Sequence, residues 1–214
     1  MTATATSTIA IWDQRYAKKA GTDRSTSYLP WLDRWRFLLA SPPGHALDLG
    51  CGLGLDAEVL SRWGFQVTAV DVSRAAIELS KARNPGAIHA VMDVRDLDCL
   101  AGQFDLVIAN LSLHYFKRES TVAVFKSVYR LVKADGVFAF RVNAFDDVES
   151  GAPSVLPGWE CVSVGGIVKQ FFTREKIEKV LGGRWRILSE EKLRVWRYNR
   201  WKSIFEVIAR KNSD

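Results

Sequence analysis

The segment of the chain best suited to chemistry is a glycine-rich loop at residues 47–54, which reads Leu-Asp-Leu-Gly-Cys-Gly-Leu-Gly. Glycines at positions 50, 52 and 54 let the backbone turn tightly and let a ligand lie against it without meeting a Cβ atom. Asp71 follows 21 residues after Gly50, at the end of a run rich in β-branched residues. A carboxylate at that place can accept hydrogen bonds from the hydroxyls of a ribose. The loop and the acid together predict a nucleoside-binding site.

The spacing of the glycines argues against a dinucleotide as the ligand. A nicotinamide-binding loop follows G-x-G-x-x-G, whereas this loop follows G-x-G-x-G and has leucine at position 55. The loop has no lysine or arginine for a pyrophosphate, and Asp48 would repel an anion and attract an ammonium or sulfonium group. The ligand that suits this loop has a ribose and an adenine but no phosphate, as in S-adenosylmethionine. A purely structural turn and a dehydrogenase are the alternatives.

Alternating strand and helix patterns surround these residues. Apolar runs predict strands at 45–50, 65–71, 87–93, 104–110 and 137–143, and helical spacing predicts helices at 28–40, 55–64, 74–83 and 117–133. Strands that are apolar along most of their length are typical of a parallel sheet covered on both faces. A further helix is expected at 172–181, and strands at 185–198 and 203–210 with a short link predict an antiparallel hairpin. The expected fold is a doubly wound α/β domain with a mostly parallel, seven-stranded sheet and an antiparallel C-terminal hairpin.

The composition of the 214 residues limits the class of protein. With 48% hydrophobic and 25% charged residues, the chain is typical of a globular protein rather than a disordered one. No apolar run approaches the roughly 18–20 residues of a membrane-spanning helix, and the N-terminus does not resemble a signal peptide. Three cysteines outside any CxxC or Cys/His cluster argue against a disulfide scaffold and a metal site. We expect a cytoplasmic protein without membrane contact, with residues 1–44 as a helical lid and residues 45–214 as the ligand-binding domain.

Five segments in order resemble the motif set of class I S-adenosylmethionine-dependent methyltransferases. They read LDLGCGLGLDA, AVDVS, VMDVRDL, FDLVIANLSLHYF and LVKADGVFAFRVN, and they extend from about residue 45 to 143. The resemblance implies a Rossmann-like methyltransferase fold, S-adenosylmethionine as the cofactor and S-adenosylhomocysteine as the product. The ending, KQFFTREKIEKVL followed by a hairpin, looks most like the small single-domain branch that includes tellurite-resistance-type methyltransferases.

The same resemblance implies a set of cofactor-binding residues. The region of Asp48–Gly54 would hold the methionine part, Asp71 the ribose hydroxyls, and Asp93 with its neighbours the adenine. The N-terminal segment 11–16 resembles an entry segment that folds over the cofactor, where Arg15 is placed to pair with the cofactor carboxylate. The expected cofactor-binding residues are Trp12, Arg15, Tyr16, Asp48, Gly50, Cys51, Gly52, Gly54, Asp71, Val72, Met92, Asp93, Val94, Asn110 and Leu111.

Residues for the methyl acceptor are expected after the fourth and fifth strands and in the N-terminal segment. They are Tyr28, His114, Tyr115, Arg141 and Asn143. His114 is the best general-base candidate because it is the only histidine in a predicted site loop. A pocket-lining role is its alternative, since methyl transfer often needs no base. The acidic side chains of residues 146–149 would attract a cationic amine, or else form a solvated loop.

The positive charge is concentrated at the end of the chain. Residues 169–214 carry 13 basic and 6 acidic side chains, and residues 194–201 mix arginine with tryptophan. Such mixing is typical of single-stranded nucleic-acid binding, although a hairpin with one buried and one wet face gives the same alternation. The sequence predicts a methyltransferase that acts on an O, N or S atom of a small molecule. An RNA-modifying methyltransferase and a non-catalytic cofactor-binding protein remain alternatives.

Overall fold

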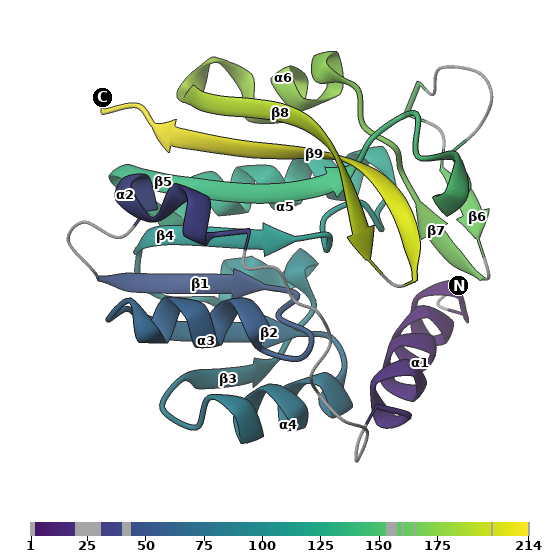
Figure 1. Ribbon diagram of the computed structural model, residues 1–214, viewed down its shortest axis with the longest axis horizontal. Helices are drawn as coiled ribbons and strands as arrows, with labels where there is room; N and C mark the ends of the chain where they lie inside the picture. The colour runs from purple at the N-terminus through teal and green to yellow at the C-terminus, as the bar shows by residue number, and fades with distance from the viewer. Residues whose placement is uncertain are drawn as a thin grey trace. The chain divides into compact units, whose positions relative to one another are not determined.

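Strands and helices alternate along the computed structural model, which describes residues 3–19, 31–39, 44–152, 158–159, 161–164, 166–197 and 199–213 (Figure 1). The helices are α1 (Ala3–Ala17), α2 (Arg36–Leu39), α3 (Leu55–Arg62), α4 (Arg74–Arg83), α5 (Arg118–Leu131) and α6 (Arg174–Leu181), with 3₁₀ turns at Asp33–Trp35, Val94–Cys99, Val148–Ser150 and Gly182–Arg184. The strands are β1 (His45–Leu49), β2 (Gln66–Asp71), β3 (Ile88–Val91), β4 (Phe104–Asn110), β5 (Val132–Asn143), β6 (Val162–Val164), β7 (Ile167–Lys169), β8 (Trp185–Arg197) and β9 (Arg200–Lys211).

Seven strands form one hydrogen-bonded sheet in the order β3-β2-β1-β4-β5-β9-β8, and β6 and β7 form a separate antiparallel pair. β1 lies between β2 and β4 and is parallel to both, whereas β9 is antiparallel to β5 and β8. The predicted mostly parallel sheet with an antiparallel C-terminal hairpin is therefore confirmed. By its internal contacts the chain divides into two units, one of residues 1–99 with 104–108 and one of residues 100–103 with 109–214.

In the first unit, α3 and α4 pack on the strands through their apolar faces. The side chains of Leu60 and Ile77 are almost fully buried, as are those of Val67 and Val70 on β2. Helix α4 is capped by Ser73, whose side chain accepts a hydrogen bond from Ala76 N at 3.1 Å. This cap satisfies one of the free N–H groups of the helix and fixes the start of α4 directly after β2.

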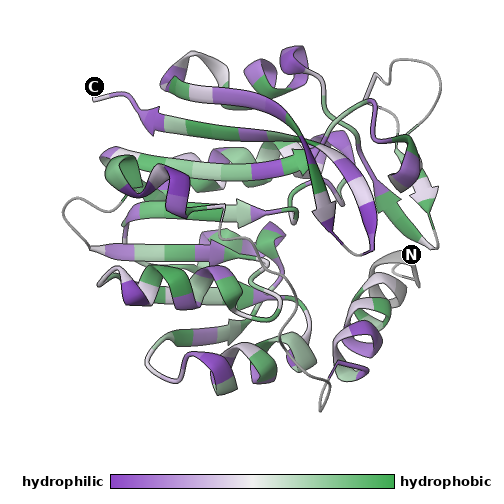
Figure 2. Ribbon diagram, in the orientation of Figure 1, coloured by the Kyte–Doolittle hydropathy of each residue, from purple (hydrophilic) through white to green (hydrophobic). Residues whose placement is uncertain are grey.

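In the second unit, the core is built on aromatic contacts between α5 and β5. The ring of Phe125 meets those of Phe138 and Phe140 edge to face, at centroid distances of 5.7 and 5.4 Å. Figure 2 shows that β5 is largely apolar along its second half, which is the part that pairs with β9. Helix α6 is capped by Thr173, whose hydroxyl accepts a hydrogen bond from Lys176 N.

Several predicted boundaries are wrong. Helix α5 ends at Leu131 and β5 begins at Val132, because the β-branched Val132 is already extended, so the helix does not continue to residue 133. β9 begins at Arg200 rather than at residue 203, since Asn199 takes a left-handed φ of 57° and returns the chain at once. The β6–β7 pair was not expected. Between residues 31 and 39 a 3₁₀ turn precedes the short α2, where a longer helix is predicted.

Among the described residues, no helix has both the length and the apolar composition that crossing a membrane requires.

Candidate functional site

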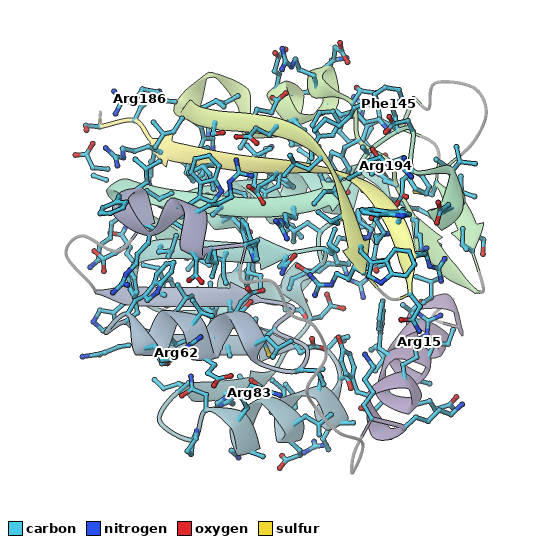
Figure 3. The ribbon with its side chains drawn as sticks, in the orientation of Figure 1. Arg15, Arg62, Arg83, Phe145, Arg186 and Arg194 are labelled. Carbon is cyan, nitrogen blue, oxygen red and sulfur yellow. The ribbon has the colours of Figure 1, made fainter. Side chains whose placement is uncertain are left out.

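The glycine loop between β1 and α3 is fastened to the end of β2. The N–H groups of Gly50 and Cys51 both donate to Val70 O, at 2.8 and 3.0 Å, and Gly54 N donates to Cys51 O at 2.9 Å. Arg83 of α4 donates to Leu53 O at 3.1 Å (Figure 3). These hydrogen bonds therefore connect the loop to the end of β2 and to α4.

Glycine is required at two of these positions for different reasons. Gly52 and Gly54 have φ values of 55° and 72°, in the region that other L-residues avoid. A Cβ on Gly54 would lie 2.3 Å from Ser80 Oγ and 2.9 Å from Ser80 Cα, so α4 packs directly against the loop backbone. A Cβ on Gly52 would lie 2.6 Å from the hydroxyl oxygen of Tyr16, so the N-terminal helix reaches the loop there.

Asp71 connects the end of β2 to the loop. One oxygen of its carboxylate accepts from Gly52 N and the other from Ser73 N, both at 2.9 Å. Burial raises the pKa of Asp71 above its ordinary value, against these two hydrogen bonds, which lower it. Each carboxylate oxygen has a second lone pair. The residue thus fixes the loop and keeps the capacity to accept from a ligand.

Asp48 lies in β1 directly before the loop and is almost completely buried. Its Oδ2 atom has no hydrogen-bond partner, and its pKa is raised well above the ordinary value by burial and then by the carboxylates of Asp56 and Asp71. Burial, followed by the charge of Asp48, also raises the pKa of the Cys51 thiol well above its usual value. Cys51 is therefore unsuited to act as a nucleophile at neutral pH.

The helix α1 is attached to the start of α4 by Asp13. Asp13 Oδ1 accepts from Ser73 Oγ at 2.7 Å and from Ala75 N at 2.9 Å. On the same helix the rings of Trp12 and Tyr16 stack with centroids 6.2 Å apart, and the Arg15 guanidinium lies 5.1 Å from the Trp12 ring centroid. The expected lid residues therefore sit on a helix anchored to the loop's neighbourhood by Asp13, which sequence analysis missed.

The residues expected at the adenine follow β3. Asp93 forms a bidentate ion pair with Arg95, whose Nε lies 3.0 Å from both carboxylate oxygens. Partial burial raises the pKa of Asp93, but the hydrogen bonds from Arg95 outweigh it and hold that pKa below its ordinary value. Met92 is half-buried and Val94 is buried. Val72, which follows β2, is also half-buried. An apolar wall and a fixed carboxylate thus lie together at the end of β3.

At the end of β4, Asn110 and Leu111 are held by contacts within the second unit. Asn110 Oδ1 accepts from an Arg197 guanidinium nitrogen at 3.1 Å. Leu111 has a φ of 59°, which is strained for a leucine, and its N–H donates to Arg141 O at 3.0 Å. Strained backbone of this kind is typical of functional sites. Arg197 was not expected here, because its 87-residue distance from Asn110 in sequence leaves no local signal.

The expected acceptor residues differ in what they contact. The Arg141 guanidinium pairs with Glu206 on β9, with Nε 2.6 Å from Oε2, and both side chains are buried. His114 is 1% exposed, and burial, followed by the charges of Lys202 and Lys169, lowers the pKa of its imidazole well below the ordinary value. The Tyr115 ring lies against it, with centroids 4.2 Å apart. Asn143 ends β5 and is fully buried, and Tyr28 lies outside the described residues.

The acidic loop after β5 is paired with the basic hairpin. Lys192 Nζ lies 2.5 Å from Asp146 Oδ2, and Lys202 Nζ lies 3.0 Å from Asp147 Oδ2. A third, looser pair joins Arg194, labelled in Figure 3, to Glu149 at 3.9 Å. All of these side chains except Lys202 line a hollow of about 350 Å³, together with Val148, Leu193, Trp201 and Ser203. Each acidic side chain of residues 146–149 is thus paired with a basic side chain of the hairpin.

The glycine loop lies within a segment of the chain that matches the model of a known protein family. Residues 47–140 match the family model described as methyltransferase domain. The Bacillus subtilis protein YqeM, a methyltransferase by name, is 33% identical over 130 residues, which are 57% of this chain and 52% of that protein. Malonyl-[acyl-carrier protein] O-methyltransferase of Enterobacter lignolyticus is 26% identical over 139 residues, 65% of this chain and 53% of that protein. The chain spans about half the length of these curated relatives.

Solved structures share the fold at lower identity. Burkholderia thailandensis 1,6-didemethyltoxoflavin-N1-methyltransferase, with bound 1,6-didemethyltoxoflavin and S-adenosylhomocysteine, superposes with a TM-score of 0.73 at 20% identity, covering 99% of this chain and 89% of that one. TehB from Haemophilus influenzae gives a TM-score of 0.70 at 18% identity, covering 94% and 67%. At such identities the similarity concerns the fold.

Proposed function

We propose that this chain, which belongs to the class I S-adenosylmethionine-dependent methyltransferases, transfers the methyl group of its cofactor to an O, N or S atom of a small molecule. The observation that carries the proposal is the glycine loop, whose left-handed Gly52 donates its N–H to Asp71. This bond joins the loop that would hold the methionine part to the acid that would hold the ribose.

The residues around the loop fit a cationic nucleoside better than a phosphate. Positions 48–54 contain no lysine or arginine, and the buried Asp48 keeps one carboxylate oxygen without a hydrogen-bond partner. A positive sulfonium nearby would favour the charged form of that acid, whereas a phosphate would be repelled by it. The loop backbone and Asp71 would hold the cofactor, with Tyr16 covering the loop at Gly52.

The chemistry supplied by the bound cofactor is a methyl carbon already activated by its sulfonium, which leaves an in-line displacement. The chain must therefore orient the acceptor atom and exclude water, rather than supply a strong base. His114 is suited to orienting the acceptor rather than to acting as a strong base. Its lowered pKa keeps the imidazole neutral at pH 7, so it can hold a hydrogen bond to the acceptor but takes up a proton weakly. Its role in this proposal is to position the acceptor.

A small molecule is favoured over RNA because three cations of the hairpin are already paired with carboxylates of the loop after β5. Lys192, Arg194 and Lys202 each face a carboxylate of residues 146–149. Nucleic-acid binding depends on cations that replace condensed counterions, and paired cations contribute little to it. The toxoflavin-type substrate named for the Burkholderia thailandensis neighbour is also a small molecule.

The proposal is tested by calorimetric titration with S-adenosylmethionine and by release of S-adenosylhomocysteine. Asp71→Ala should weaken cofactor binding by about 1.5–3 kcal/mol, because hydrogen bonds to a charged carboxylate are lost. Glu78→Ala, an exposed position on α4, is the matched control and should bind as the wild type does.

Turnover is measured with a low-mass cell extract, total RNA and a protein fraction as separate acceptors. Release confined to the low-mass extract is the expected result. Release with RNA alone would refute the small-molecule proposal. Tight cofactor binding with no release in any fraction would instead favour a non-catalytic binding protein.

A further inference from the structure

Most of the buried polar atoms that lack a hydrogen-bond partner belong to three residues of the second unit. Among the described residues, six buried side-chain nitrogen or oxygen atoms have no hydrogen-bond partner, and four of them belong to His114, Asn143 and Gln170. Both amide atoms of Asn143 are unpaired, as are Gln170 Oε1 and His114 Nδ1. A buried polar group without a partner destabilises the folded state, because it has lost its hydrogen bonds to water. Such a concentration calls for a ligand that restores these bonds.

Backbone hydrogen bonds bring the three residues together, although they come from three segments. Gln170 N donates to His114 O at 2.7 Å, and Phe172 N donates to Asn143 O at 2.9 Å. Ala144 and Phe172 form an isolated parallel bridge beside them. The segment 170–172 therefore runs between the loop after β4 and the end of β5 and carries Gln170 into the same neighbourhood. We call His114, Asn143 and Gln170 the amide cluster.

Two ion pairs lie beside the amide cluster, and the charge of Lys169 also acts on His114. Lys202 pairs with Asp147, and Arg141 pairs with Glu206, in each case with both side chains almost fully buried. The unpaired capacity that remains consists of the donor and acceptor of Asn143, an acceptor on Gln170 and one imidazole nitrogen. The members of both ion pairs are already engaged, so neither pair offers an opposite charge to a carboxylate or an ammonium ion. A neutral group with a donor next to an acceptor would match Asn143 on both atoms.

We propose that the amide cluster recognises the methyl acceptor, and that this acceptor is a neutral molecule with a lactam-like edge, an N–H beside a C=O. The inference rests on the proposed function, since it names the acceptor class of the same enzyme. The unpaired atoms are buried, so the acceptor must displace a covering side chain. Tyr115, half-buried with its ring against His114, covers the imidazole and is the side chain we expect to move.

The test uses four probe molecules and ligand-observed saturation-transfer NMR. 2-Pyridone carries the N–H and C=O edge, N-methyl-2-pyridone lacks the donor, and benzoate and benzylammonium carry opposite charges. We expect 2-pyridone to bind the full chain at least about tenfold more tightly than the other three, because each lost partner leaves a buried group unpaired. Equal binding of all four probes, or no binding of 2-pyridone, would overturn the proposal.

Variants separate recognition from a structural role. Asn143→Leu removes both unpaired groups at similar volume, so its urea midpoint should be unchanged or higher while 2-pyridone binding is lost. Gln170→Leu is a second, independent variant with the same expectation, and the exposed Asn212→Leu is the control that should bind normally. Wild-type affinity for 2-pyridone in both cluster variants would contradict the assignment.

S-adenosylhomocysteine binding is measured on the same samples and should not change in these variants. If the wild type failed to bind S-adenosylhomocysteine, the proposed function would fail, whereas the probe results would still judge the amide cluster by themselves.

Discussion

Replacing Gly54 by alanine tests whether the glycine loop and α4 are packed as tightly as the structure indicates. Gly54 has a φ of 72°, and a Cβ there would lie 2.9 Å from Ser80 Cα, a backbone atom that cannot rotate away. The alanine must therefore strain its own backbone and push α4 away from the loop.

The magnitude follows from these two effects. A left-handed conformation costs a non-glycine residue about 1–2 kcal/mol. Overpacking that forces a backbone shift costs about 1–3 kcal/mol. The loss of unfolded-state entropy returns about 0.4–1 kcal/mol. We expect Gly54→Ala to lower the free energy of unfolding by about 1–5 kcal/mol.

Urea unfolding followed by tryptophan fluorescence gives the free energy directly. Gly86→Ala is the matched control, because no atom lies within 4 Å of its added Cβ and its φ is not left-handed. Gly86→Ala should change the free energy of unfolding by about 1 kcal/mol or less. The change should be an increase, because alanine lowers the entropy of the unfolded chain. If the two variants were equally stable, the close approach of loop and helix would be refuted.

Three further substitutions probe charged groups. Asp13→Ala should speed amide exchange in α1, because two hydrogen bonds to α4 worth about 1 kcal/mol each are lost; unchanged exchange would contradict that anchor. The raised pKa of Asp48 makes its contribution to stability complete below the ordinary carboxyl pKa and lost as pH rises through the folded pKa. Urea midpoints against pH should therefore slope less in Asp48→Asn, and an identical slope would refute the assignment. Arg141→Met should cost about 3–5 kcal/mol in urea unfolding by removing the cationic partner of the buried Glu206 carboxylate, and adding Glu206→Gln should recover part of that loss.

The elements and the glycine loop could be predicted because their signals are local. The bounds of α4 and β4 match the predicted ranges to the residue, since caps, apolar periods and flanking turns lie within a few positions of each element. The left-handed glycines follow from the same local turn chemistry. Their position between β1 and α3 follows from the alternation of strands and helices.

The parts that could not be predicted depend on residues far apart in sequence. Asp13 meets Ser73 across 60 positions, and Arg197 meets Asn110 across 87. Nothing near Arg141 in sequence marks its pairing with Glu206, which depends on the register of β5 against β9. The amide cluster depends on the segment 170–172 lying beside the end of β5. No hydrophobic periodicity in the sequence predicts that placement.

The ion pairs between residues 146–149 and the hairpin make the second unit responsive to ionic strength. The Lys192–Asp146 and Arg194–Glu149 pairs are exposed, and at 1 M salt the Debye length of about 3 Å screens such contacts strongly. Lys202 and Asp147 are buried, so salt should screen their ion pair much less than the two exposed pairs. A dependence of activity on salt would thus reflect the weakening of the ion pairs that connect residues 146–149 to the hairpin. It would imitate the salt signature of a polyanion substrate without one being bound.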